Sequence, residues 1–239
     1  MSRSFMIALA LFASTTIAAR GGEVVAYSIA SNGGRASSTA TAQGNASSVA
    51  HSAATNGGTA ISNSSAVGLG TGRANSISTA MADRGLAISN SRADARGFFG
   101  SAALANSTSN AATVGGISTS NSVAEADARF NALADSAATS LSLSEFGIAN
   151  SDSVARSDGA LGGRAVAVSD SVADAMGGRA DSRVRAHAGA RLYGSAQSNG
   201  LGVSASRSRQ TMNARVTAIS RADRFGHSKS NAVQVKIRR

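Results

Sequence analysis

Histidine and serine are the residues of this chain best suited to metal binding or catalysis, but their spacing argues against both roles. His51, His187 and His227 are far apart, and none stands in an H-x-H or H-x-x-x-H spacing that would direct two imidazoles at one metal ion. We therefore expect solvated side chains. The 41 serines include no G-x-S-x-G motif that would project a nucleophile. The chain has no Cys, which excludes disulfides, thiolate zinc sites and cysteine nucleophiles.

Glycine-rich segments also lack the residues that would make them binding loops. The run Gly68-Leu69-Gly70-Thr71-Gly72 has no Lys-Ser/Thr after it and no βαβ pattern around it, so it indicates a turn rather than a phosphate site. The segments GGRADS and GGRAVAVSD do not place Asp at the offset that calcium-binding β-rolls use. We predict a protein that is not an enzyme, with no cofactor and no metal site.

Two kinds of site remain as candidates. Three N-glycosylation sequons stand at Asn45, Asn63 and Asn106. The second candidate is basic: residues 179–239 hold 13 of the 23 Lys and Arg but only two acidic residues, so all of the net charge of +10 resides there. Contacts with an anionic partner, an acidic protein or a glycan, are predicted for Arg183, Arg185, Arg207, Arg209, Arg221 and Arg224.

The basic region has a second interpretation, since charge at the end of a β-structure also blocks strand edges and keeps the chain soluble. A nucleic-acid partner is not expected, because no aromatic residues are interleaved with the arginines to stack on bases. The sequence leaves the first two interpretations open.

Composition limits the elements that can position any of these residues. The 51 Ala, 41 Ser and 26 Gly make up about half of the 239 residues, and only 4% of the chain is aromatic. A conventional core of large side chains is therefore excluded. Disorder is not favoured either, because the chain has no Pro, only 15% charged residues and a mean hydropathy near zero.

The first residues have the features of a secretory signal peptide. Arg3 is followed by the apolar run FMIALALFA and by small residues suited to cleavage after Ala18 or Ala19. The run is too short to span a bilayer, and no later segment of the chain is apolar enough to do so. We expect residues 1–19 to be a signal peptide and the protein to be secreted.

A period of two organises the rest of the chain. Ala or Ser occupies every second position in stretches such as Ala87 to Ala95 and Ala165 to Ala175, and the positions between carry the larger and charged residues. Strict alternation predicts strands with one small-residue face. Glycine-bearing breaks such as Asn56-Gly57-Gly58 and Asn199-Gly200 separate stretches that start 13 to 18 residues apart.

These units predict an all-β fold of repetitive short strands with Gly turns, either a thin β-solenoid or a flat cross-β stack. Four regions follow: the signal peptide 1–19, a lead-in 20–35, the β-repeat 36–178 and the basic region 179–239. A local helix over 122–139 is the alternative for one stretch, because Ser122 and Glu125 have capping-box spacing.

Short Ala/Ser strands with Gly-containing turns behind a signal peptide resemble the cross-β silk fibroins of insects, such as those of lacewing egg stalks. The chain departs from such silks in the many Arg and Asp on its outward register. Segments NSVAEADA and SDSVADAMGG look similar to the β-roll heads of bacterial trimeric adhesins, although no heptads or barrel strands follow. Flat antifreeze solenoids are a poorer match, since Thr39 and Thr41 form the only Thr-x-Thr pair on the strand register.

The resemblance to silk implies a secreted structural protein that self-assembles through stacked strands into a fibre or matrix. The alternative is a soluble β-solenoid that presents a repetitive face to ice, a glycan or a cell surface. Neither interpretation needs a membrane span.

Overall fold

The computed structural model is all-β over the residues it describes, which are 12–70, 72–98, 102–130, 133–161, 164–176, 178–191, 195–206, 212–223 and 227–238. Fourteen strands account for nearly all of them. In chain order they are β1 (Phe12–Ala30), β2 (Arg35–Ala54), β3 (Thr59–Gly70), β4 (Arg73–Asp83), β5 (Leu86–Phe98), β6 (Ala102–Val114), β7 (Ile117–Arg129), β8 (Leu133–Glu145), β9 (Ile148–Ala160), β10 (Arg164–Ala175), β11 (Arg179–Arg191), β12 (Ser195–Ser206), β13 (Met212–Asp223) and β14 (His227–Arg238).

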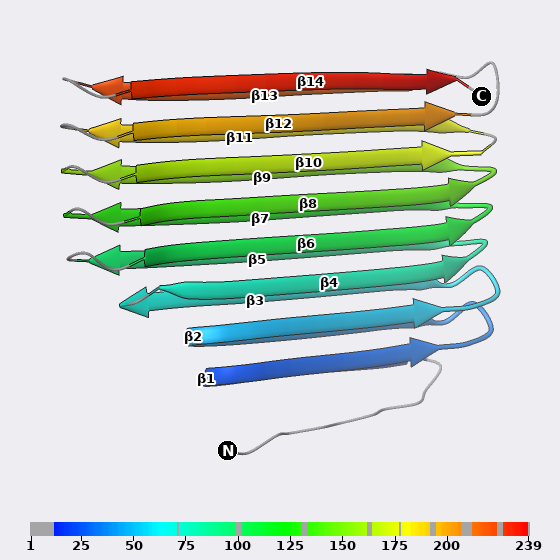
Figure 1. Cartoon of the computed structure of the whole chain (residues 1–239). Coiled ribbons are helices and arrows are strands. Elements are labelled where there is room, and N and C mark those ends of the chain that lie inside the picture. Colours follow the sequence, from blue (N-terminus) through cyan, green and yellow to red (C-terminus); the bar gives the residue numbers. More distant parts are fainter. Residues whose placement is uncertain are drawn as a thin grey trace.

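Successive strands alternate between two parallel sheets, so the chain is a β-solenoid (Figure 1). The odd sheet contains β3, β5, β7, β9, β11 and β13, and the even sheet contains β4, β6, β8, β10, β12 and β14. β2 belongs to both, because its residues 35–43 pair with β3 and its residues 46–54 pair with β4. Gly44, at φ 94°, lies between these halves, and Gly22, at φ 97°, lies at the corresponding place in β1.

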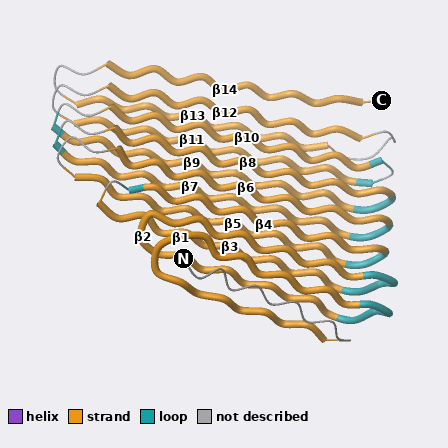
Figure 2. Tube along the Cα trace, turned by 60° about the horizontal axis from the view of Figure 1, so that its bottom comes forward, coloured by secondary structure: helices purple, strands orange, loops and turns teal. Residues whose placement is uncertain are grey.

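The predicted strand-and-turn unit is confirmed, and two such units make one turn of the coil. Leu86 is aligned with Ile117, Ile117 with Ile148, and Ile148 with Arg179, so one turn takes 31 residues. Strands β5 to β14 form a regular solenoid of about five turns, and β1 to β4 continue the two sheets beneath it (Figure 2). The basic C-terminal strands β11 to β14 extend the same sheets without a break in pairing.

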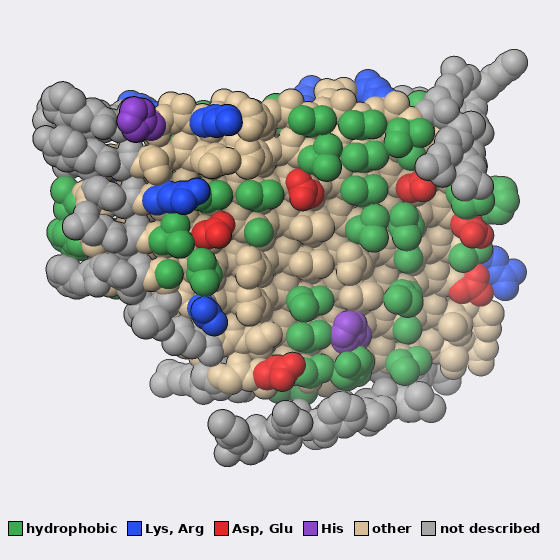
Figure 3. Space-filling model, viewed as in Figure 1, with side chains coloured by type: hydrophobic (Ala, Val, Ile, Leu, Met, Phe, Trp, Pro, Cys, Tyr) green, Lys and Arg blue, Asp and Glu red, His purple; other side chains and the backbone are tan. Residues whose placement is uncertain are grey.

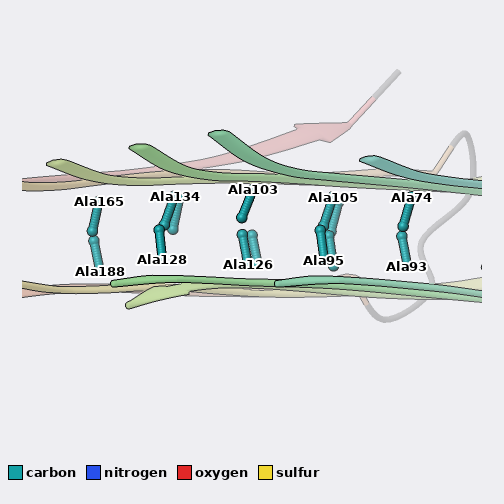
Figure 4. Close-up of a cluster of buried hydrophobic side chains, with 14 of the residues drawn as sticks. Ala74, Ala93, Ala95, Ala103, Ala105, Ala126, Ala128, Ala134, Ala165 and Ala188 are labelled. Atoms are coloured by element: carbon teal, nitrogen blue, oxygen red, sulfur yellow. The ribbon is translucent and has the colours of Figure 1, made fainter. Parts of the chain in front are cut away.

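The interior consists of the small-residue register, as predicted. Along each central strand, buried and less buried residues alternate, and the buried ones are almost all Ala or Ser. Figure 4 shows Ala74 and Ala165 of the even sheet pointing at Ala93 and Ala188 of the odd sheet. Because no buried side chain among the described residues is bulkier than a valine, the fold forms a thin core of methyl groups and hydroxyls rather than a thick one.

Buried serines connect the two sheets by hydrogen bonds. Ser122 on β7 donates its hydroxyl proton to the carbonyl oxygen of Ser107 on β6, at 2.6 Å. Ser107 in turn donates to the carbonyl of Ser91 on β5, at 2.8 Å. Similar bonds recur along the stack, for example from Ser140 to Ser120 at 2.6 Å and from Ser171 to Ser151 at 2.8 Å. These bonds give the hydroxyls the partners that burial requires.

A column of glycines forms one edge of the coil, where the chain passes from the even to the odd sheet. The carbonyl of Gly85 accepts a hydrogen bond from the Ile117 N–H, at 3.0 Å, which extends the ladder into the turn. A β-carbon added at Gly116 would overlap that same Gly85 carbonyl. Equivalent clashes occur along the whole glycine column, which consists of Gly58, Gly85, Gly116, Gly147 and Gly178. Only glycine fits this stacking distance.

The alternative of a local helix is not formed, and one sequence expectation about a turn is wrong. The stretch 122–139 is strand in β7 and β8 wherever it is described, because its small residues are needed in the interior register. Asn199-Gly200 lies inside β12 and is not a turn. Gly200 and Gly202 instead leave room for valines: a β-carbon at Gly200 would fall 3.1 Å from Val184 Cγ1 and 2.9 Å from Val216 Cγ1.

The predicted signal peptide falls partly outside the described residues, which begin at Phe12. Residues 12–20 form the first half of β1 and pair with residues 35–43 of β2. Among the described residues there is no helix of the length and apolarity needed to cross a bilayer.

Candidate interaction surfaces

The three histidines lie on different strands, and each has a local structural setting. His51 on β2 stacks on Tyr27 of β1 with ring centroids 4.9 Å apart, and burial lowers the pKa of His51. His187 lies on β11 of the odd sheet, and its Nδ1 is buried without a hydrogen-bond partner. His227 begins β14. Among the described residues, no three His, Asp or Glu side chains gather closely enough to hold a metal ion.

The two broad outer faces of the solenoid differ in chemistry, and the odd face is the more charged, although it also exposes apolar side chains such as Ile117 and Ile219. Its outward positions include an asparagine ladder in which Asn121 donates to Asn90, and Asn90 to Asn63, both at 2.9 Å. Arg92 on β5 forms an ion pair with Glu125 on β7 at 3.2 Å, and all these groups are exposed or half-buried. Such pairs fix strand register more than they stabilise the fold, contributing under about 1 kcal/mol each.

The even face carries more apolar side chains than the odd face, interspersed with polar ones such as Asn75, Asn106 and Gln197. Figure 3 shows this face, where hydrophobic side chains lie in several groups separated by polar side chains and a few charged ones. Six of its aliphatic side chains are between 37% and 56% exposed, and they come from strands along the whole stack: Ile29, Ile77, Met81, Leu143, Leu201 and Val233. Exposed aliphatic side chains that recur along a flat face are typical of an interaction surface.

Large and small residues alternate along one row of the even face. Ile29, Ala53, Met81, Ala112 and Leu143 are successive aligned partners on β1, β2, β4, β6 and β8. We call this row the alternating column. Ala53, Met81, Ala112 and Leu143 of this column line a groove of about 560 Å³, which Asp83, Glu145 and Asp174 also border. The column therefore presents protruding side chains separated by recesses at a two-strand repeat, about 10 Å.

Two carboxylates on the even face lie in apolar surroundings. Burial raises the pKa of Asp170, which is aligned with Thr139 and Leu201. Burial also raises the pKa of Asp135, and the nearby Arg164 guanidinium partly offsets this effect. Both carboxyl groups are more readily neutralised than ordinary surface aspartates.

The predicted glycosylation sites lie on strands. Asn63 is an outward residue of β3, and its Oδ1 accepts the Asn90 amide. Asn106 is exposed on β6 of the even face, where it donates to Asn75 at 3.1 Å. Asn45 falls within β2, and its side chain lies outside the described part of the chain.

Three of the six predicted anion contacts come together on the odd face. Arg183 and Arg185 lie on β11, and Arg221 lies on the neighbouring β13, all on outward exposed positions. Arg207, Arg209 and Arg224 lie outside the described residues. Sequence reasoning missed Arg191 and Arg215 as members of the same face; the alternating register combined with the 31-residue turn was the signal that would have found them.

Fold and faces together define the protein as a thin two-sheet parallel β-solenoid whose even face is richer in aliphatic side chains and whose odd face is richer in charged ones. No protein-family model, curated protein or solved structure matches the chain.

Proposed function

We propose that this protein is a secreted, non-enzymatic structural protein whose solenoids associate face to face, building a fibre or extracellular matrix. The observation that carries the proposal is the even face, richer in aliphatic side chains than the odd face, with its alternating column. Secretion rests on the sequence of residues 1–19.

A second copy of this chain is the occupant best suited to the even face. Strands of about a dozen residues in a stack of eight give a face of roughly 1,400 Å², from the rise and spacing of β-strands. A stable interface needs about 800 Å² per partner. The face is flat and extended, so a matching flat sheet covers far more of it than a convex partner does.

The alternating column supplies a register for this pairing. A two-fold axis parallel to the strands places each strand of one copy opposite a strand of the other with the stacking order reversed. When the second copy is shifted along the stack by one strand, Met81 of the first copy enters the recess at Ala112 of the second. Leu143 of the first copy then enters the recess at Ala53 of the second. Protruding side chains in recesses are the arrangement of dry, interdigitated sheet interfaces.

The end of the stack favours lateral over end-to-end growth. In β14, the last strand of the even sheet, Gln234 and Lys236 occupy positions aligned with Gly202 and Ser204, which face the interior in β12. An exposed lysine in the inward register of an edge strand opposes addition of another strand. Assembly through the broad faces avoids that obstacle.

Sedimentation velocity of the full chain across a concentration series tests the proposal. Wild-type protein should form dimers and larger species, and Met81→Glu with Leu143→Glu should sediment as a monomer with an unchanged circular dichroism spectrum. The matched control carries Ile61→Glu and Val123→Glu on outward positions of the odd face and should still associate. Monomeric wild-type protein, or equal loss of association in both variants, would contradict the proposal.

A further inference from the structure

The outward side of β11 and β13 carries a concentration of arginine found on no other described pair of strands. The six side chains, which we call the arginine strip, are Arg179, Arg183, Arg185, Arg191, Arg215 and Arg221. All six lie at odd-numbered positions, which are the outward positions of both strands, so they project from the same face.

Elsewhere on the odd face, arginine is balanced by nearby carboxylates. Arg156 lies 2.9 Å from Asp158 within β9, and Arg92 lies 3.2 Å from Glu125 across strands. On β11 and β13 the acidic residues are Asp181, which pairs with Arg179 at 2.7 Å, and Asp223, which is aligned with Arg191, against six arginines. The nearest carboxylate to Arg183 belongs to Asp152 on β9, at 3.9 Å. The strip therefore has a local excess of positive charge.

Two of these arginines are direct neighbours. Arg183 and Arg215 are aligned partners on β11 and β13, and adjacent strands lie about 4.8 Å apart. Like charges directly opposite each other on a sheet are destabilising. An anionic group between the two guanidinium groups removes this repulsion and can accept paired N–H donors from each.

We propose that the arginine strip binds a sulfated polysaccharide. The strip is two strands wide and about 40 Å long, the length of a 12-residue strand, which matches one extended polyanion rather than a duplex. A sulfated polysaccharide carries anionic groups on both sides of its chain, so one molecule can reach both rows of arginines. Phe, Tyr and Trp are absent from β11 and β13, so the strip has no stacking platform for bases.

A depression of about 920 Å³ on the odd face continues from the strip toward the N-terminal strands. Arg191 and Arg221 line its strip end, and Asp127 and Asp158 lie further along it. Beyond the strip, Arg96, Arg129 and Arg156 pair with Asp94, Asp127 and Asp158, so that part of the depression attracts a polyanion less than β11 and β13 do. This binding uses the face opposite the self-association surface and is independent of it.

Heparin binding, measured by isothermal titration calorimetry at increasing NaCl concentration, tests the proposal. Arg183→Gln with Arg215→Gln should weaken heparin binding at least about tenfold at physiological salt and reduce its salt dependence. The matched control, Arg92→Gln with Arg156→Gln, removes the same charge from strands outside the strip, where each arginine pairs with a carboxylate at 3.2 Å or closer, and should change binding less than about twofold.

Equal weakening in both variants would show attraction by net charge alone and would overturn the assignment. Absence of wild-type binding to heparin would overturn it as well. Duplex DNA and poly-glutamate serve as competing probes: displacement of heparin by either at equal charge concentration would contradict a polysaccharide partner. The Met81→Glu, Leu143→Glu variant should keep heparin binding, which separates this result from the outcome of the assembly experiment.

Discussion

Val216 on β13 packs so closely against Gly202 on β12 that a β-carbon at position 202 would lie 2.7 Å from Val216 Cγ2. Val184 on β11 occupies the same layer and is fully buried. In this last part of the coil, two valines replace the usual Ala and Ser of the odd sheet, and glycines on the facing strand offset their volume. The facing residues of the two sheets therefore keep about the same combined volume along the coil, although the residue types differ.

This compensation predicts a coupled pair of substitutions. Gly202→Ala should destabilise the fold by about 1–3 kcal/mol, because it overpacks a rigid layer. Adding Val216→Ala should recover most of that loss. Urea denaturation of both single variants and the double variant measures the coupling. Additive effects would mean that the two side chains do not share one space.

The glycine column predicts a severe effect of a single methyl group. Gly116→Ala should prevent close stacking of adjacent turns, because the added β-carbon overlaps the Gly85 carbonyl, and the thermal midpoint should fall or the chain should fail to fold. Gly189→Ala is the matched control, since its β-carbon would meet only the flexible Asp158 side chain. Thermal unfolding followed by circular dichroism compares them; similar midpoints for both variants would contradict the stacking.

Removing one serine hydrogen bond between the sheets should lower the free energy of unfolding by a modest but measurable amount. Ser122→Ala removes the 2.6 Å hydrogen bond to the Ser107 carbonyl and should lower the unfolding free energy by about 1 kcal/mol. Ser122→Leu should cost more, because the layer admits only small side chains. Ser65→Ala, on an outward position of β3, should change stability by less than about 0.5 kcal/mol. A Ser122→Leu variant as stable as the wild type would contradict the claim that this layer admits only small side chains.

His51 predicts a fall in stability on mild acidification. Burial lowers its pKa in the folded protein below the ordinary value of 6.5, so the unfolded chain binds the proton more readily. Stability from this group is complete above pH 6.5 and is lost as the pH falls through the folded pKa. His51→Gln should flatten that part of the profile, measured by urea denaturation between pH 7.5 and pH 5. If stability depends on pH in the same way in His51→Gln and in the wild type, His51 is not the cause of that dependence.

The raised pKa of Asp170 predicts that stability depends on pH in the direction opposite to that expected for His51. The pKa of Asp170 is raised above the ordinary value of 3.8, so its contribution to stability is complete below pH 3.8 and is lost as the pH rises through the folded pKa. Asp170→Asn should therefore stabilise the protein near pH 7 and have little effect near pH 3.5. Equal effects at both pH values would contradict a burial-driven shift.

The interior was predictable from the sequence because strand geometry alone sets its period of two. The alternation from Ala165 to Ala175 correctly indicates which side chains are buried. The sequence did not reveal that alternate strands join different sheets, since each unit looks alike until the 31-residue spacing of Gly85 and Gly116 is noticed. Asn199-Gly200 was misassigned because glycine serves there as a recess and not as a turn.

The surfaces were less predictable, because each depends on residues about one turn apart. Arg183 and Arg215 are 32 positions apart in sequence and adjacent in space. Met81, Ala112 and Leu143 form a column only after three strands are aligned. Charge counting located the basic region, but only the register shows which arginines share a face.

Cross-linking of single engineered cysteines tests the central claim, association through the even face, most directly. The chain contains no Cys, so one introduced thiol reports on its own position. With a short bis-maleimide reagent at dilute concentration, Met81→Cys on the even face should give covalent dimers, and Thr119→Cys on the odd face should remain monomeric. Equal yields from both positions, or dimers from Thr119→Cys alone, would contradict the account.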